Sequence, residues 1–145
     1  MAKKRVASAV ASATCGECGK RHRTLTEEQC EDRRMTEATL QQRVIGRAKR
    51  RGWEVAHAGK GWVGDAETGE GQFVTPMAPG WPDLMLFNPR AKIRAIAMEL
   101  KREQGEVSDE QWKWLELLNN CGIPAVIVRP SDLRSGLVNV ILDGV

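Results

Sequence analysis

Apolar residues recur with helical spacing near the middle of the first half of the chain and with strand spacing in several short runs that follow. The helical pattern extends from Leu40 to Ala48, after a potential N-cap at Thr36, and predicts a helix that ends near Arg51. Turn residues from Asn88 to Ala91 separate two of the apolar runs, which predicts a β-hairpin. The expected strands cover 53–57, 82–87, 93–101, 125–128 and 137–142.

A second helix is expected to begin after Ser108. Gln111, three residues later, completes the capping-box pattern, and Gly122 is expected to end the helix. The apolar residues between Trp112 and Leu118 would form its buried stripe, with Leu115 between them.

The Gly-rich polar segment 59–71 is expected to be a loop. The predicted order is then helix, strand, hairpin, helix, strand, strand. This order indicates an α/β fold with a mixed β-sheet flanked by helices.

Composition narrows the class of protein. With 145 residues, 41% hydrophobic and 28% charged, the chain fits one globular domain plus a short appendage. No apolar run approaches the roughly 18 residues that a membrane span requires, so no membrane association is expected.

Positive charge is concentrated at the front of the chain. Residues 1–51 contain 13 lysines and arginines against 6 acidic residues, whereas residues 52–145 are acidic overall. A basic helix can neutralise DNA phosphates, although a solvated helix face explains the same charge pattern. The candidate DNA contacts are Arg43, Arg47, Arg50 and Arg51 on the helix and Lys60 in the loop.

The segment 1–35 is polar, basic and too poor in large apolar residues to form a core alone, so the folded domain is expected to cover 36–145. Three cysteines and a histidine lie in this tail: Cys15, Cys18, His22 and Cys30. They form either an irregular zinc knuckle or a flexible, metal-free CxxC segment.

The fourth cysteine, Cys121, is expected to be a small buried hydrophobic residue. The four cysteines do not suggest an extracellular disulfide framework, so a reducing cytoplasm is the expected compartment.

Acidic residues lie where the expected hairpin ends. Alternation places Glu99 and Lys101 on one face of their strand, and closure of the hairpin brings Asp83 opposite Glu99 or its neighbour. Glu37 projects from the core-facing stripe of the first helix. Crowded carboxylates suit a hard cation such as Mg²⁺ or Mn²⁺, which promotes phosphodiester hydrolysis when an ammonium group lies beside it.

The runs "GWPDLMLF" (80–87) and "AMELK" (97–101) resemble the PD-(D/E)xK nuclease signature. The surrounding segments, including "ELKREQGEVSDEQWKWLELLNNCG" and "PAVIVRPSD", are similar to the VRR-NUC branch of that superfamily, which is common in phages. The resemblance covers about residues 36–135 and implies a restriction-endonuclease-like core.

The resemblance also implies roles for individual residues. Asp83 and Glu99 would be metal ligands together with the backbone carbonyl of Leu100, and Lys101 would be the catalytic lysine. Glu37 would complete or orient the metal site. Gln111 matches a recurrent glutamine of the family, although a helix cap explains it equally well.

One segment departs from the family pattern. The stretch that corresponds to the name-giving Val-Arg-Arg is Val128-Arg129-Pro130, which leaves Arg129 as a phosphate contact without a second arginine.

The resemblance implies a metal-dependent DNA endonuclease, with branched or Holliday-junction DNA among its substrates. It would act as a homodimer, in the cytoplasm of a bacterial host if the chain is phage-encoded. The alternatives are a non-catalytic, zinc-containing nucleic-acid-binding module and an enzyme that cuts RNA on the same core.

Overall fold

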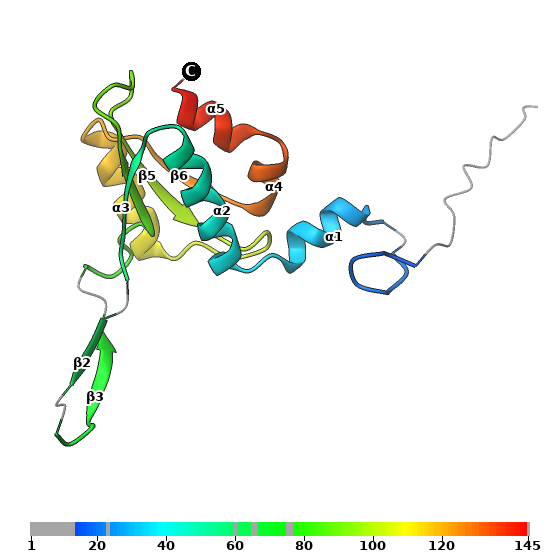
Figure 1. The fold of residues 1–145 in the computed structure, drawn as a ribbon, viewed down its shortest axis with the longest axis horizontal. Helices are drawn as coiled ribbons and strands as arrows, with labels where there is room; N and C mark the ends of the chain where they lie inside the picture. Colours follow the sequence, from blue (N-terminus) through cyan, green and yellow to red (C-terminus); the bar gives the residue numbers. More distant parts are fainter. Residues whose placement is uncertain (1–13, 23, 60, 65–66, 75–76, 145) are drawn as a thin grey trace, which may run out of the picture.

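The computed structural model describes residues 14–22, 24–59, 61–64, 67–74 and 77–144, and its body is a mixed four-stranded sheet between two layers of helices (Figure 1). The strand order is β1-β4-β5-β6. The first three strands are antiparallel and β6 runs parallel to β5. The strands are β1 (Glu54–His57), β4 (Leu84–Phe87), β5 (Ala95–Leu100) and β6 (Ala125–Val128). The expected α/β fold with a mixed sheet is confirmed.

Helices cover both faces of the sheet. The larger core lies between one face and the helices α2 (Glu37–Arg50), α4 (Pro130–Arg134) and α5 (Leu137–Asp143). The helix α3 (Asp109–Asn120) packs on the other face, over a smaller cluster that includes Met85 and Leu118. This division follows from strand alternation, because residues 84, 86, 96 and 98 point to the first layer and residues 85 and 97 to the second.

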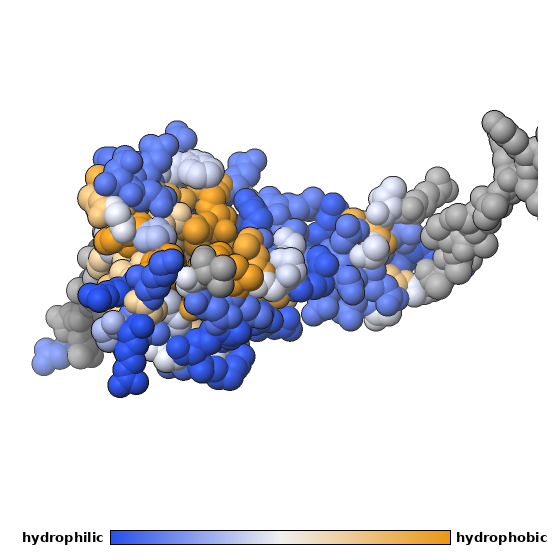
Figure 2. Space-filling view, turned by 90° about the horizontal axis from the view of Figure 1, so that it is seen from above, coloured by the Kyte–Doolittle hydropathy of each residue, from blue (hydrophilic) through white to orange (hydrophobic). Residues whose placement is uncertain are grey.

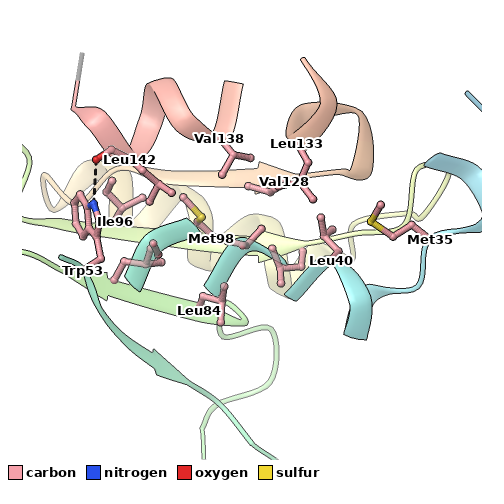
Figure 3. Packing of buried hydrophobic residues seen from close by; sticks show 14 residues of the cluster. Met35, Leu40, Trp53, Leu84, Ile96, Met98, Val128, Leu133, Val138 and Leu142 are labelled. Atoms are coloured by element: carbon pink, nitrogen blue, oxygen red, sulfur yellow. Dashed lines mark hydrogen bonds between the residues drawn. The ribbon is translucent and has the colours of Figure 1, made fainter. Parts of the chain in front are cut away.

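A polar contact at the edge of the larger core comes from the tryptophan that directly precedes β1. Trp53 is buried and its indole nitrogen donates to the carbonyl of Leu142 at 2.9 Å, which joins the first strand to the last helix (Figure 3). Figure 3 also shows Met35 at the far end of the same cluster, next to Leu40 of α2. The segment before α2 therefore contributes to the core of the body.

The expected helices at 36–51 and after Ser108 are confirmed. The hydroxyl of Thr36 accepts from the amide of Thr39, and Ser108 and Gln111 form a complete capping box. The hairpin of β4 and β5 is also confirmed, with Leu84 paired to Met98.

The prediction of a strand at 137–142 is wrong, because this segment forms α5. Val138 and Leu142 are buried one helical turn apart, while Leu137 and Val140 are exposed. The buried residues of this segment therefore follow helical spacing. The β-branched residues suggested a strand, but packing against the core outweighs their intrinsic preference.

The prediction of a loop at 59–71 is also incorrect. The chain forms a separate two-stranded antiparallel sheet of β2 (Gly61–Gly64) and β3 (Gly71–Val74), which lies away from the main sheet (Figure 1). The connecting turn includes Gly69 with φ +70°, a conformation that favours glycine. Lys60, a candidate DNA contact, lies outside the described residues.

Two burial predictions on α3 are wrong. Trp112 is 47% exposed, so the buried stripe consists of Leu115 and Leu118. Cys121 is exposed as well, because it is the C-cap residue immediately before Gly122, where the helix turns away from the sheet.

A helix precedes the expected domain. α1 (Glu27–Arg34) begins at Thr26, whose capping box with Gln29 follows the same rule as that of Ser108. In the described part of the chain, none of the helices has the length and hydropathy that crossing a membrane requires.

Candidate active site

Two carboxylates from the inner strands meet at one end of the main sheet. The β4–β5 register, continued by one residue, places Asp83 opposite Glu99, and each carboxyl group influences the pKa of the other. The backbone amide of Leu100 donates a hydrogen bond to Oδ2 of Asp83 at 2.7 Å. Asp83 is therefore held at the start of β4 by the end of β5.

Proline 82 changes the hydrogen bonding at this sheet end. Asn88 donates to Arg94 across the hairpin. Continued beyond Leu84–Met98, the same alternation places Pro82 opposite Leu100 at a position where a hydrogen-bonded pair would follow. Proline has no N–H, so the carbonyl of Leu100 lacks its ladder donor. The sequence Pro82-Asp83 thus leaves one backbone oxygen without that partner beside two carboxylates.

Lys101 and Gln111 both contact Glu99. The ammonium nitrogen of Lys101 lies 3.3 Å from Oε1 of Glu99. The side-chain amide of Gln111, in the first turn of α3, donates to the same oxygen. Glu99 is only 1% exposed, so these contacts supply the polar partners that a buried carboxylate needs.

Glu37 approaches the same end of the sheet from the first turn of α2. Its side chain is exposed, and its negative charge acts on Asp83. The prediction that Glu37 projects from the core-facing stripe of the helix is therefore wrong, because the residue is exposed in the first turn of α2, outside the buried stripe of Leu40, Val44 and Ala48.

The pKa values of Glu99 and Asp83 are both raised. Burial raises the pKa of Glu99 to about 7, and the charge of Asp83 adds to the effect while Lys101 opposes it. Burial also raises the pKa of Asp83, against the lowering effect of the Leu100 amide. Burial is the largest cause of both shifts.

This donor set fits a hard divalent cation. Asp83, Glu99 and the Leu100 carbonyl offer oxygen atoms only, with Glu37 nearby, and a bound cation offsets the cost of ionising buried, crowded carboxylates. The structure therefore brings together the predicted metal ligands and Lys101, whose roles remain predictions.

A glycine turn places Asp83 against α3. Gly80 has φ +80°, and a Cβ at this position would collide with the backbone of Glu110. The next residue, Trp81, packs edge-to-face on Trp114 with ring centroids 4.9 Å apart. The indole nitrogen of Trp114 donates to Pro79 at 3.0 Å. Trp81 therefore anchors this turn to α3.

Most of the predicted DNA-contacting cations have partners within the protein. Arg47 donates to the Leu133 carbonyl and to Asn139, and Arg51 pairs with Asp143 at 2.8 Å. Arg43 lies 3.7 Å from Glu31. A separate case is Arg50, which is exposed at the far end of α2, about 20 Å from Glu37 along the helix axis.

Arg129 shapes the loop that follows β5. Its guanidinium donates to the carbonyls of Arg102, Glu103 and Gly105 at 2.7 to 3.1 Å. The resemblance implied a phosphate contact here, and the geometry gives the residue an internal role in the loop next to Lys101.

Two arginines that the sequence did not single out line a cavity beside this loop. The cavity holds about 330 Å³ and is lined by Arg33 of α1 and by Arg102, Gln104 and Gly105. Both arginines are exposed, and among the described residues neither guanidinium has a hydrogen-bond or ion-pair partner. The sequence signal that could have identified Arg102 is its position directly after Lys101.

The predicted zinc ligands also lie together. The ligand atoms of Cys15, Cys18, His22 and Cys30 are all within 4.8 Å of one another. An amide hydrogen bond from Lys20 lowers the pKa of Cys18 to about 7. The segment thus contains a possible Cys₃His metal site on the side of the body where α1 lies (Figure 1).

Comparison with known families adds to this geometry. Residues 74–132 match the family model of the VRR-NUC domain. This part of the chain is thus similar to VRR-NUC domains. Neither a curated protein nor a solved structure matches the chain significantly.

The VRR-NUC match covers the hairpin, the helix α3 and β6, and thus contains Asp83, Glu99, Lys101 and Gln111. A VRR-NUC domain implies a nuclease-type function, with a divalent metal and DNA as partners. Glu37 and the cysteine segment lie before the matched residues.

Proposed function

We propose that this chain is a Mg²⁺- or Mn²⁺-dependent DNA endonuclease. The observation that carries the proposal is the convergence of Asp83, Glu99 and Lys101 at one end of the VRR-NUC sheet, beside an unpaired ladder position at the Leu100 carbonyl. Such an arrangement can hold a cation next to an ammonium group.

The residues have separate tasks in this proposal. Asp83, Glu99 and the Leu100 carbonyl hold the cation, and Glu37 adds negative charge. The cation supplies Lewis acidity toward phosphate oxygens and water. Lys101 places a compact positive charge where the phosphate gains negative charge. Gln111 fixes the orientation of Glu99 through its amide.

DNA is proposed to approach over the cavity between α1 and the loop after β5. Arg102 and Arg33 are the exposed cations of that cavity, and Arg102 is adjacent to Lys101 in the chain. This replaces α2 as the main phosphate-contacting surface, because Arg47 and Arg51 have internal partners.

A plasmid-nicking assay tests the proposal. The full chain should nick supercoiled plasmid with Mg²⁺ or Mn²⁺ and not with a chelator. Asp83→Asn and Lys101→Ala should each lower the rate by about 10³-fold or more, while DNA binding persists. Lys113→Ala, which changes an exposed lysine of α3, is the matched control and should cut normally. Equal cutting by all variants would contradict the site.

Substrate choice and subunit number need their own measurements. We propose branched DNA as a preferred substrate, to be compared with linear, nicked and flap DNA and with RNA of the same sequence.

A homodimer would supply one site for each strand. Figure 2 shows apolar surface on the body when it is seen from above. The exposed Leu137 and Val140 of α5 offer the homodimer an apolar interface. Light scattering with a Val140→Lys variant tests the dimer.

The cysteine cluster favours a second candidate, a zinc-containing nucleic-acid-binding module without catalysis. This candidate predicts DNA binding with no metal-dependent cutting on any substrate of the panel. Nicking that depends on Asp83 would exclude it.

A further inference from the structure

The N-terminal cysteines form a knuckle whose backbone is arranged for a metal. Cys15 donates its amide to the Lys20 carbonyl at 2.9 Å, and Gly19, with φ +69°, donates to the Cys15 carbonyl at 2.8 Å. The amide of Lys20 points to the thiol of Cys18. This tight turn brings two sulfur atoms to the same side.

The other two ligands complete a tetrahedral set. His22 Nε2 lies 2.9 Å from Cys18 Sγ, and Cys30 extends from α1 into the same cluster. Zinc bonds of about 2.3 Å to sulfur and 2.0–2.1 Å to nitrogen place neighbouring ligands about 3.5–3.8 Å apart. The observed atoms, all within 4.8 Å of one another, reach that geometry with small side-chain movements.

This segment has almost no apolar core of its own. Between residues 14 and 34, Cys15 and Cys30 are the buried hydrophobic side chains of the described residues. Direct contacts join the knuckle to α1, because Gly16 donates to Glu27 at 3.0 Å and Arg34 donates to the Glu17 carbonyl. A unit that is so short of apolar burial needs another source of folding free energy, and a bound metal supplies one.

An ion pair between a buried carboxylate and an exposed guanidinium attaches this unit to the body. Asp32 of α1 is 4% exposed and accepts from the guanidinium of Arg134 in α4, with a distance of 2.9 Å from Nε. Arg134 also lies 3.5 Å from Glu28. The attachment sets Arg33, the neighbour of Asp32, at the cavity that it shares with Arg102.

We propose that Cys15, Cys18, His22 and Cys30 bind one Zn²⁺, and that this zinc holds α1 in place so that Arg33 contacts the DNA backbone beside the active site. Three thiols release their protons to solvent as the zinc binds, and His22 binds as neutral imidazole. The zinc has a structural role and takes no part in hydrolysis. The role of Arg33 rests on the proposed DNA-binding function, whereas zinc binding does not.

Zinc content of the purified full chain is the first test. The wild type and Cys121→Ser, which changes the exposed cysteine outside the cluster, should each hold about one zinc per chain. Cys18→Ser and Cys30→Ser should lose at least about nine-tenths of it. Cobalt-loaded wild type should show the absorption of thiolate-bound Co²⁺. A wild type that takes up no zinc, or equal zinc in all four proteins, would overturn the proposal.

DNA affinity, measured with Ca²⁺ to suppress cutting, tests the role of the zinc. Cys18→Ser and Arg33→Gln should weaken binding by similar factors, about three- to tenfold, and the double variant should be no weaker than Cys18→Ser alone. Far-UV dichroism should show that the body of each variant remains folded. Independent effects, or unchanged affinity in Cys18→Ser, would refute the coupling even if zinc is bound. Absence of nicking, with zinc binding and DNA affinity as expected, would contradict the proposed nuclease function and leave the role of the zinc unaffected.

Discussion

The side-chain amide of Gln111 joins Glu99 to the cap of α3. Its nitrogen donates to Glu99, and its oxygen accepts the amide of Ser108 at 2.9 Å. The sequence left a catalytic role and a helix cap as alternatives for Gln111. The cap is observed, and the contact with Glu99 leaves a catalytic role as a prediction. The start of α3 is thereby fixed to the end of β5.

Gln111→Ala should lower cutting by about 10- to 100-fold, because it removes a group that orients a proposed metal ligand. Ser108→Ala is the matched control, since it removes the cap and keeps the contact to Glu99. Both variants should lose about 1 kcal/mol of folding stability. Nicking rates and thermal unfolding separate the two effects, and equal rates for both variants would assign Gln111 to the cap alone.

The stability of the metal-free protein should fall as pH rises between about 4.5 and 7. Burial raises the pKa of Glu99 to about 7 in the folded state, so the folded protein binds more protons than the unfolded chain over this range, and stability decreases with pH. Glu99→Gln should flatten this part of the profile. Thermal unfolding at fixed ionic strength measures it, and a profile that rises for the wild type would contradict the assignment.

Divalent metal should reverse the effect of pH at the same site. Because a cation competes with protons for Asp83 and Glu99, whose pKa values are raised, the affinity for Mg²⁺ or Mn²⁺ should increase as pH rises toward and past 7. Titration calorimetry at several pH values, with Asp83→Asn as the control, checks this expectation. Affinity that does not change with pH would exclude the carboxylate pair as the ligand set.

Gly80→Ala should destabilise the protein by about 2–4 kcal/mol. The substitution combines a positive φ with a collision against the backbone of Glu110. Gly122 has φ +81° and no atom within 4 Å of a Cβ, so Gly122→Ala should cost only about 1–2 kcal/mol of strain. Denaturant unfolding of the two variants compares them, and equal losses would mean that the turn around Gly80 relaxes.

Asp32→Asn should release α1 from the body without unfolding the sheet. The substitution removes the charge that Arg134 pairs with, at a local cost of about 1.5–3 kcal/mol. Trypsin should then cleave faster at Arg33 and Arg34, while the main thermal transition stays close to that of the wild type. Glu28→Gln, whose carboxylate is exposed and 3.5 Å from Arg134, is the weaker control. Unchanged cleavage would show that α1 is held by other contacts.

Arg102→Gln should reduce DNA affinity more than Arg50→Gln does. Arg102 lines the cavity next to Lys101, whereas Arg50 is about 20 Å from Glu37. If Arg102 contacts one phosphate, its loss should reduce the salt slope of binding by about 1. Filter binding over a range of salt concentrations measures both slopes. A larger effect at Arg50 would restore α2 as the DNA surface.

Much of the fold and the acidic site was predictable because local and tertiary signals agree there. Thr36 and Ser108 mark helix starts, and alternation around Asp83 and Glu99 fixes which side chains meet. The segment 137–142 was misassigned because its β-branched residues suggested a strand, whereas burial follows Val138 and Leu142 one helical turn apart.

Other features depend on contacts that a single sequence does not contain. The internal partners of Arg47 and Arg129 come from elements far along the chain. The attachment of α1 through Arg134 joins residues about a hundred positions apart. Charge pattern alone does not distinguish such cations from free ones, which is why Arg102 was overlooked.

Asp83 and Glu99 extend from β4 and β5, the strands that have a neighbour on both sides in the main sheet. Displacing either carboxylate requires neighbouring ladders to separate, which amounts to global unfolding. We therefore expect the Leu100 amide, bonded to Asp83, to be among the slowest in the protein to exchange with deuterium. The α1 amides should exchange early. The site formed by Asp83 and Glu99 and the helix α1 would therefore lose their structure at different denaturant concentrations.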